Sequence, residues 1–211
     1  MSTTSSTAKR KYSLRDIGCR KRACIKEEPH FNLHESLSMQ VVKHKTKHKN
    51  QTYTNESHVS RVKTSQQSSI YLTNYNSANE ESTLTKHKIV AVLTLGRDNE
   101  LHRDVLDVLG CDEAYTIFHV RDERTIDTVA QMKNHVLPEA RRFISRWLPF
   151  GNVLVHCSRG VCRSPLVVLD YLINADSHSI EKAASAITRR RWCVSPGPTL
   201  LSALFAAVGD E

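Results

Sequence analysis

The chain has 211 residues, enough for one domain of ordinary size and an appendage. Its formal net charge is +8, yet residues 1–68 hold 14 Lys and Arg against 5 Asp and Glu, whereas residues 69–211 hold 16 against 17. No stretch reaches the roughly 18 apolar residues of a membrane span, and the Ser/Thr-rich start lacks the apolar core of a secretory signal. Six cysteines without regular spacing predict free thiols, and hence a protein of the nucleus, the cytoplasm or both.

Residues 1–68 are rich in Ser, Thr, Lys, His and Gln and poor in large apolar side chains. Such a segment cannot bury enough surface to offset its ordering entropy, so we predict a disordered basic tail. Residues 9–11 and 20–22 resemble a split nuclear-import signal, and residues 43–49 form a second basic cluster. An import receptor or a polyanion is the partner that these charges suggest, and a merely solvated tail is the alternative.

From residue 69 onward, strand and helix patterns alternate. We predict strands at residues 70–72, 88–95, 114–120 and 152–155. We predict helices at residues 77–85, 100–109, 127–148, 165–173, 179–190 and 199–208, with a kink or break at Pro138. The near-continuous apolar run at 88–95 is typical of a strand covered on both faces. Residues 69–211 are therefore predicted to form an α/β domain with a central, mostly parallel sheet flanked by helices.

A polar loop lies between the predicted strand at 152–155 and the helix that follows it. A tight loop at this junction directs several backbone N–H groups, and the positive end of the helix dipole, toward one point. Cys157 opens the loop, where such a field favours the nucleophilic thiolate. Arg163 adds a planar guanidinium that can hold two phosphate oxygens. Ser164 is predicted to cap the helix and Pro165 to be its first residue. Together, the backbone N–H groups, Cys157 and Arg163 make this segment a candidate phosphate-binding loop with a nucleophile at its base.

The sequence His156-Cys157-x-x-Gly160-x-x-Arg163-Ser164 resembles the active-site signature of the cysteine-based protein phosphatases, in particular the small dual-specificity phosphatases of the protein tyrosine phosphatase superfamily. The resemblance extends over about two thirds of the chain. It includes the opening strands of that domain, its general-acid loop and the stretch before its last helix, at residues 70–72 and 88–93, 120–122, and 191–196, respectively.

The resemblance implies a role for each residue of the loop. Cys157 attacks phosphorus and becomes a phosphocysteine, while Arg163 binds the phosphoryl group that is transferred. Ser164 donates its hydroxyl to the departing sulfur, and His156 orients the loop through hydrogen bonds. The remaining loop residues bind the substrate mainly through backbone N–H groups: Ser158, Arg159, Gly160, Val161 and Cys162. Cys162 is open to two interpretations, a thiol that traps oxidised Cys157 as a disulfide or a small residue of the loop.

The reaction also needs an acid for the leaving oxygen and a base for the incoming water, and one carboxylate can serve as both. Asp122 resembles the general acid of the family by its place in Val120-Arg121-Asp122. It lies 35 positions before Cys157, a slightly longer separation than expected. Asp127 therefore remains an alternative, although it could instead cap a helix, and Glu123 is a weaker one.

The implied function is hydrolysis of phosphotyrosine and of phosphoserine or phosphothreonine in proteins, without a metal or cofactor. The alternatives are a phosphatase for RNA 5′-phosphates or phosphoinositides, and a phosphoprotein-binding pseudophosphatase. The presence of both Cys157 and Arg163 argues against the last of these. Gly197 departs from the Asn that many relatives carry after Pro196, which would weaken a support of the loop. Four tail residues of zinc-ligand type lack the spacing of a zinc finger: Cys19, Cys24, His30 and His34.

Overall fold

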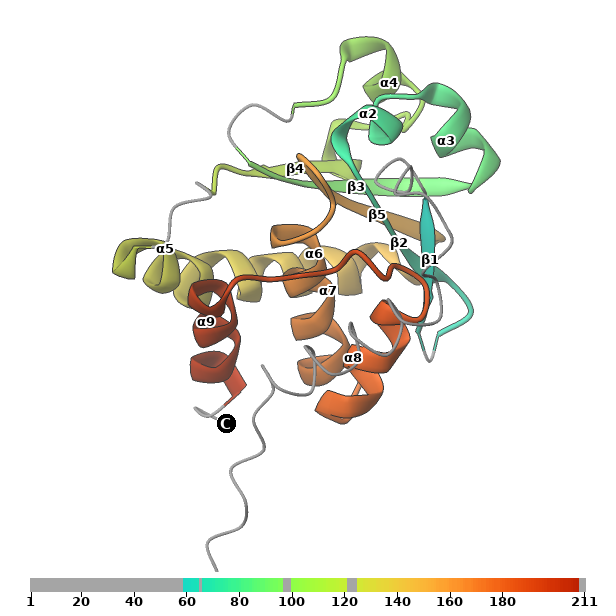
Figure 1. Ribbon diagram of the computed structural model, residues 1–211. Coiled ribbons are helices and arrows are strands. Elements are labelled where there is room, and N and C mark those ends of the chain that lie inside the picture. The colour runs from blue at the N-terminus through green and yellow to red at the C-terminus, as the bar shows by residue number, and fades with distance from the viewer. Residues whose placement is uncertain (1–58, 65, 97–99, 121–124, 209–211) are drawn as a thin grey trace, which may run out of the picture. The chain divides into compact units, whose positions relative to one another are not determined.

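The computed structural model describes residues 59–64, 66–96, 100–120 and 125–208, all within the compact unit Phe31–Glu211 (Figure 1). The basic clusters of the tail, its four candidate zinc ligands, Asp122 and Glu123 lie outside these residues. No helix of the described ranges is long and apolar enough to cross a membrane.

The described residues form a five-stranded sheet in the order β1-β2-β5-β3-β4. The strands are β1 (Ser60–Lys63), β2 (Ser69–Thr73), β3 (Ile89–Leu95), β4 (Tyr115–Phe118) and β5 (Asn152–Cys157). β1 pairs antiparallel with β2, and every other pair in this sheet is parallel. The predicted α/β fold with a mostly parallel sheet is therefore confirmed, and β5 is its central strand.

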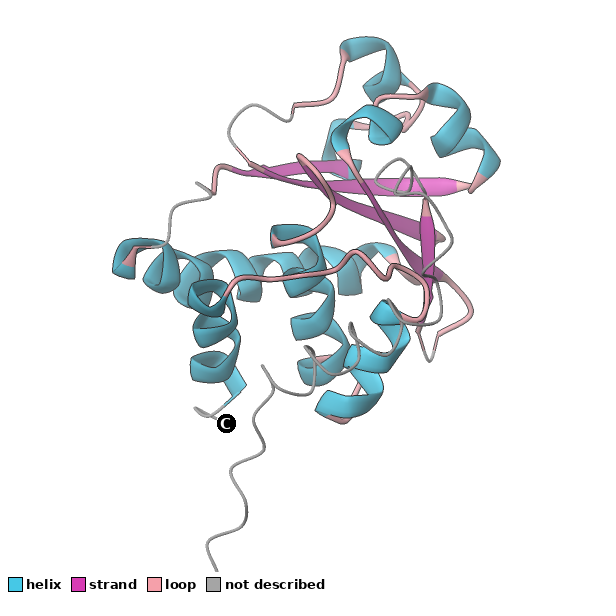
Figure 2. Cartoon of the chain, viewed as in Figure 1, coloured by secondary structure: helices cyan, strands magenta, loops and turns pink. Residues whose placement is uncertain are grey.

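Helices cover both faces of the sheet (Figure 2). On one face lie α2 (Tyr75–Ala78), α3 (Glu81–Lys86) and α4 (Arg103–Asp107), and a short 3-10 helix, η2 (Asp112–Ala114), precedes β4. On the other face lie α5 (Ile126–Gln131), η3 (Met132–Val136), α6 (Leu137–Trp147), α7 (Arg163–Asn174), α8 (Ile180–Thr188) and α9 (Pro198–Val208).

β5 is buried because strands flank both of its edges and helices cover both of its faces. Val153 and Val155 belong to the larger apolar core, with residues of α6 and α7. Leu154 points to the opposite face, where it packs in a smaller cluster with residues of α3 and α4. This double burial explains the continuous apolar run that leads into the loop.

α7 is buried from residue 163 to residue 172, including a charged residue in its middle. The Asp170 carboxylate has no exposed surface and pairs with the Arg141 guanidinium of α6 at 2.9 Å. It also accepts a hydrogen bond of 2.9 Å from the Asn174 side chain. The buried charge is thus compensated by a cation and a donor, which fixes α7 against α6.

The long helix predicted at residues 127–148 contains a π-helical turn, η3, between α5 and α6. Pro138 follows this turn as the second residue of α6. The wider turn accommodates the missing N–H of the proline, so the helix continues instead of breaking. Asp127 was predicted as a possible helix cap, and this is wrong: the Thr125 hydroxyl accepts from the backbone N–H of Thr128 at 3.2 Å.

The helix predicted at residues 77–85 is in fact two short helices, α2 and α3. α2 begins earlier than predicted because the Asn74 side chain accepts a hydrogen bond from the backbone N–H of Ser77 at 2.9 Å. The helix predicted at residues 100–109 is shorter, because α4 begins only after His102. Both differences concern helix ends, which depend on such local hydrogen bonds.

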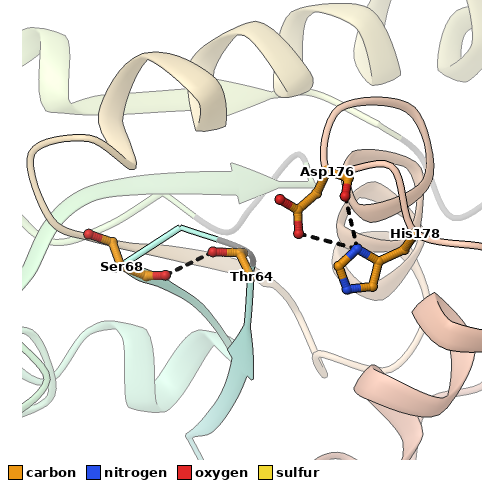
Figure 3. A network of polar contacts seen from close by, with 4 residues as sticks. All are labelled: Thr64, Ser68, Asp176 and His178. Carbon is orange, nitrogen blue, oxygen red and sulfur yellow. Dashed lines mark hydrogen bonds and ion pairs between the residues drawn. The ribbon is translucent and has the colours of Figure 1, made fainter.

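The sheet begins before the predicted domain boundary, because β1 falls inside the segment that we predicted to be disordered. Val62 of this strand is fully buried in the larger core. The sequence did not indicate this, because Val62 is the one apolar residue among the four residues of the strand. The Thr64 hydroxyl donates to the Ser68 carbonyl at 2.8 Å and closes the connection to β2 (Figure 3). Figure 3 also shows the turn before α8, where His178 Nδ1 lies 3.3 Å from the Asp176 carboxylate.

Candidate active site

The loop of residues 158–162 leaves the carboxyl end of β5 and enters α7, as predicted. Cys157 is the last residue of β5, and only 2% of its surface is exposed. The Ser164 hydroxyl lies 3.3 Å from the Cys157 sulfur and donates to it. Ser164 is therefore not the helix cap that we predicted. It is the second residue of α7, and Cys162 occupies the cap position without a capping side-chain bond.

Gly160 has a backbone conformation that favours glycine, with φ at +66°. It is also closely packed: a Cβ atom at this position would meet the carbonyl oxygen of Thr73 and would lie 2.5 Å from Nη2 of Arg191. The loop therefore depends on glycine for its dihedral angle and for the close approach of β2 and Arg191 behind it.

The other residues predicted to bind substrate are arranged around Gly160. Ser158 and Arg159 are exposed, Val161 is buried, and Cys162 is partly buried. The Ser158 carbonyl accepts from the backbone N–H of Tyr75 at 3.1 Å, which joins the loop to the start of α2. The Cys162 thiol donates to the Ser195 carbonyl at 3.1 Å, and Cys157 is a free cysteine.

His156 is completely buried beside the nucleophile. Its Nε2 atom lies 2.7 Å from the Thr94 hydroxyl, and the register of β3 and β5 places these two residues opposite each other. Burial lowers the pKa of His156 from 6.5 to about 3, against a smaller opposing effect from the backbone of Cys157. The ring is therefore neutral at physiological pH and acts as a fixed hydrogen-bonding group.

Arg163 begins α7, and 8% of its surface is exposed. Its Nη1 atom donates to the Val120 carbonyl at 2.9 Å. Val120 lies two positions before Asp122 in the sequence, so the backbone that leads to the predicted general acid contacts the loop arginine. The alternative acid, Asp127, is an exposed residue in the first turn of α5.

Two residues of the site were missed from the sequence. Thr94 lies in an apolar strand, where a threonine is expected to be only a part of the core. Arg191 is the last of three successive arginines, and although the resembling stretch of residues 191–196 begins with it, the sequence does not indicate a role for it. The structure does, because Arg191 is 2% exposed and lies against the loop, whereas its two neighbours are exposed.

Within the described part of the chain, no group of three or more His, Cys, Asp or Glu side chains is placed to hold a metal ion. The positive groups described around the loop include Arg159, Arg163, Arg191 and the start of α7. A thiol at the end of a central strand, next to a loop with these positive groups, is the arrangement of an oxyanion-binding site with a nucleophile.

A model of one protein family matches residues 70–208, and its description is dual specificity phosphatase, catalytic domain. The chain belongs to the dual-specificity phosphatase family. The resemblance inferred from the sequence is therefore confirmed, and membership supports protein phosphatase activity in general terms.

Curated protein phosphatases match shorter stretches of the chain. Protein phosphatase Slingshot of Drosophila melanogaster is 38% identical over 64 residues, which is 30% of this chain and 6% of that protein. Dual specificity protein phosphatase 5 of Rattus norvegicus is 44% identical over 46 residues, which is 22% of this chain and 12% of that protein. The matched stretches are thus a small part of those relatives' own length.

Solved structures of dual-specificity phosphatases have the same fold. Human DUSP28 is 21% identical, with a TM-score of 0.57 over 72% of this chain and 93% of that one. A mouse putative dual specificity phosphatase, complexed with zinc tungstate, is 18% identical, with a TM-score of 0.58 over 76% of this chain and 92% of that one. At these identities the likeness concerns the fold.

Proposed function

We propose that this chain hydrolyses phosphotyrosine and phosphoserine or phosphothreonine in proteins through a phosphocysteine intermediate on Cys157. The observation that carries the proposal is the geometry of the loop: the Cys157 sulfur ends the central strand, accepts the Ser164 hydroxyl at 3.3 Å and precedes the first turn of α7. A sulfur in this position lies at the positive end of a helix dipole, where the negatively charged phosphate that it attacks is also stabilised.

In the first step, the thiolate of Cys157 forms a bond to phosphorus while the bond from phosphorus to the substrate oxygen breaks. Arg163 and the backbone N–H groups of residues 158–162 hold the three equatorial oxygens as their negative charge develops. The Asp122 carboxyl gives its proton to the leaving oxygen. The contact of Arg163 with Val120 supports this assignment, because it brings the backbone two positions from Asp122 to the loop.

In the second step, water attacks phosphorus as the Asp122 carboxylate removes a proton from it, and inorganic phosphate leaves. The bond between sulfur and phosphorus breaks, and the hydroxyl of Ser164 stabilises the thiolate that re-forms. Neutral His156 keeps the start of the loop in place through Thr94. The chemistry in this scheme uses groups of the chain and water.

The test is turnover of an aryl phosphate by the purified protein. Cys157→Ser and Arg163→Lys should each abolish turnover, the latter because lysine cannot make a bidentate contact. Cys157→Ser should still bind a phosphopeptide. Full activity in either variant would refute the cysteine mechanism.

The general acid is tested with two matched variants. Asp122→Asn should slow alkyl phosphates far more than aryl phosphates with good leaving groups, because only the poor leaving groups need a proton. Asp127→Asn should change both little, since its side chain is exposed in α5. The reverse ranking would transfer the role to Asp127.

A second candidate substrate class is a polyanion such as an RNA 5′-phosphate or a phosphoinositide, and the basic composition of residues 1–68 favours it. Release of phosphate from phosphopeptides, triphosphate-ended RNA and phosphoinositides, compared at one enzyme concentration, separates these substrates. Binding of phosphopeptides without turnover would instead support the pseudophosphatase.

For the basic segment itself we propose nuclear targeting through an import receptor. The support is the pair of clusters at residues 9–11 and 20–22. Replacing these arginines and lysines by alanine in the full chain should reduce nuclear accumulation and leave aryl phosphate turnover unchanged. An unchanged distribution between nucleus and cytoplasm would refute the proposal.

A further inference from the structure

A buried arginine lies behind the loop. Arg191 follows α8 and is among the largest fully buried side chains of the described residues, with 2% exposure. Its Nε atom donates to the Gly160 carbonyl at 2.7 Å, and Nη2 donates to the Arg159 carbonyl at 3.2 Å. Nη1 lies 3.5 Å from the Ser60 hydroxyl of β1. One guanidinium thus connects two successive carbonyls of the loop to the first strand of the sheet.

The segment that follows Arg191 continues these contacts. The backbone N–H of Ser195 donates to the Val161 carbonyl at 2.9 Å, and the Ser195 carbonyl accepts from the Cys162 thiol at 3.1 Å. Carbonyls 159, 160 and 161 are therefore all bound by the segment of residues 191–195, which we call the backing segment.

The direction of these carbonyls determines the direction of the loop amides. In a trans peptide the C=O of one residue and the N–H of the next point in opposite directions. The N–H groups of Gly160, Val161 and Cys162 must therefore point away from the backing segment. Three consecutive donors on one side of a curved loop are an oxyanion site.

We propose that Arg191 is a positioning residue that turns these three amides toward the phosphate held over Cys157, and that its buried charge strengthens the binding of that phosphate. The proposal rests on the proposed phosphatase function. A guanidinium suits the role because it stays charged when buried and has several donors in one plane. Lysine has one nitrogen and cannot hold both carbonyls in the same plane.

Gly160 is part of the same set of contacts behind the loop. A Cβ atom at position 160 would lie 2.5 Å from the Nη2 atom of Arg191, so this placement of the arginine requires a glycine at position 160. Arg191 acts from behind the loop, through the carbonyl oxygens of Gly160 and Arg159.

The experiment compares Arg191→Met and Arg191→Lys with Arg190→Met as the matched control, all in the full chain. The measured quantity is the inorganic phosphate concentration that halves the alkylation rate of Cys157 by iodoacetamide at a fixed pH. Arg191→Met should raise this concentration at least about tenfold, as expected for loss of hydrogen bonds to a charged group. The half-protecting phosphate concentration of Arg191→Lys should lie between those of Arg191→Met and the wild type, and that of Arg190→Met should equal the wild-type value.

Circular dichroism in the near ultraviolet shows whether each variant is folded. A folded Arg191→Met variant whose half-protecting phosphate concentration lies within twofold of the wild type would overturn the proposal. With an aryl phosphate, the folded variant should also show a raised KM, whereas a residue that only stabilises the fold would leave the KM unchanged.

A second measurement needs no variant and therefore holds even if Arg191→Met does not fold. Titration of the wild type with tungstate should shift the backbone amide resonances of Gly160, Val161 and Cys162. Unshifted amides at saturation would refute the proposed orientation. A wild type that binds tungstate and shows these shifts but hydrolyses no phosphoester would refute the proposed function and leave this inference intact.

Discussion

Acid should destabilise this protein through His156, and the size of the effect follows from the burial of its ring. The folded chain keeps the ring neutral down to a pH of about 3, whereas the unfolded chain binds a proton near pH 6.5. Because the unfolded state binds the extra proton, stability is highest above pH 6.5 and falls as the pH is lowered toward 3.

The loss is about 1.4 kcal/mol for each pH unit within this window. Between pH 7.5 and pH 5.0 only the part below 6.5 counts, about 1.5 units, so His156 alone should reduce the free energy of unfolding by about 2 kcal/mol. Other titrating groups add to the total. The prediction therefore concerns the difference between the wild type and a variant without this ring.

The variant is His156→Gln, whose amide can still bond the Thr94 hydroxyl. Urea unfolding at pH 7.5 and pH 5.0 gives the free energy of unfolding of each protein. The wild type should lose about 2 kcal/mol more than His156→Gln over this interval, whatever their stabilities at pH 7.5. Equal losses in the two proteins would show that His156 is protonated in the folded state, contrary to its burial.

Four further predictions concern the loop and its surroundings. Gly160→Ala should lower the free energy of unfolding by on the order of 1–3 kcal/mol in urea and abolish phosphate protection, because alanine disfavours φ at +66°; a stable, phosphate-binding variant would contradict this. Ser164→Ala should give a burst of aryl alcohol followed by slow turnover, because the phosphocysteine persists when no hydroxyl stabilises the departing sulfur. A time course without a burst would count against this role of Ser164. After brief peroxide treatment, dithiothreitol should restore less activity to Cys162→Ser than to the wild type if Cys162 traps oxidised Cys157; equal recovery would leave Cys162 as a small loop residue. Gly197→Asn should change the free energy of unfolding by less than about 0.5 kcal/mol, since nothing lies within 4 Å of the added Cβ, and a larger loss would show a contact made by the new side chain.

The sequence predicted the strand, loop and helix around Cys157 because each of its signals is local. The apolar run of β5, the glycine and the proline lie within a few residues of one another, and local spacing specifies such a junction. The details of the helix start were not predictable in the same way. Ser164 is a good cap by type, but its hydroxyl bonds the Cys157 sulfur seven positions earlier, an interaction of the folded loop.

The residues that the sequence did not reveal act over long separations. Thr94 reaches His156 across 62 positions, and Arg191 reaches Gly160 across 31. Nothing in a single sequence pairs such residues. β1 was missed for a related reason: its place in the sheet depends on pairing with β2 and on burial of Val62, and its own residues carry little strand signal.

The central position of β5 has a consequence for how the site is lost when the protein opens locally. β2 and β3 pair with β5 along both edges, so its amide hydrogens are shielded on each side, whereas β1 and β4 form the margins of the sheet. Partial opening can detach a marginal strand while β5 stays paired, and hydrogen exchange in β5 then requires disruption of the whole sheet. The strand that ends in Cys157 is therefore among the last parts of the domain to exchange with solvent.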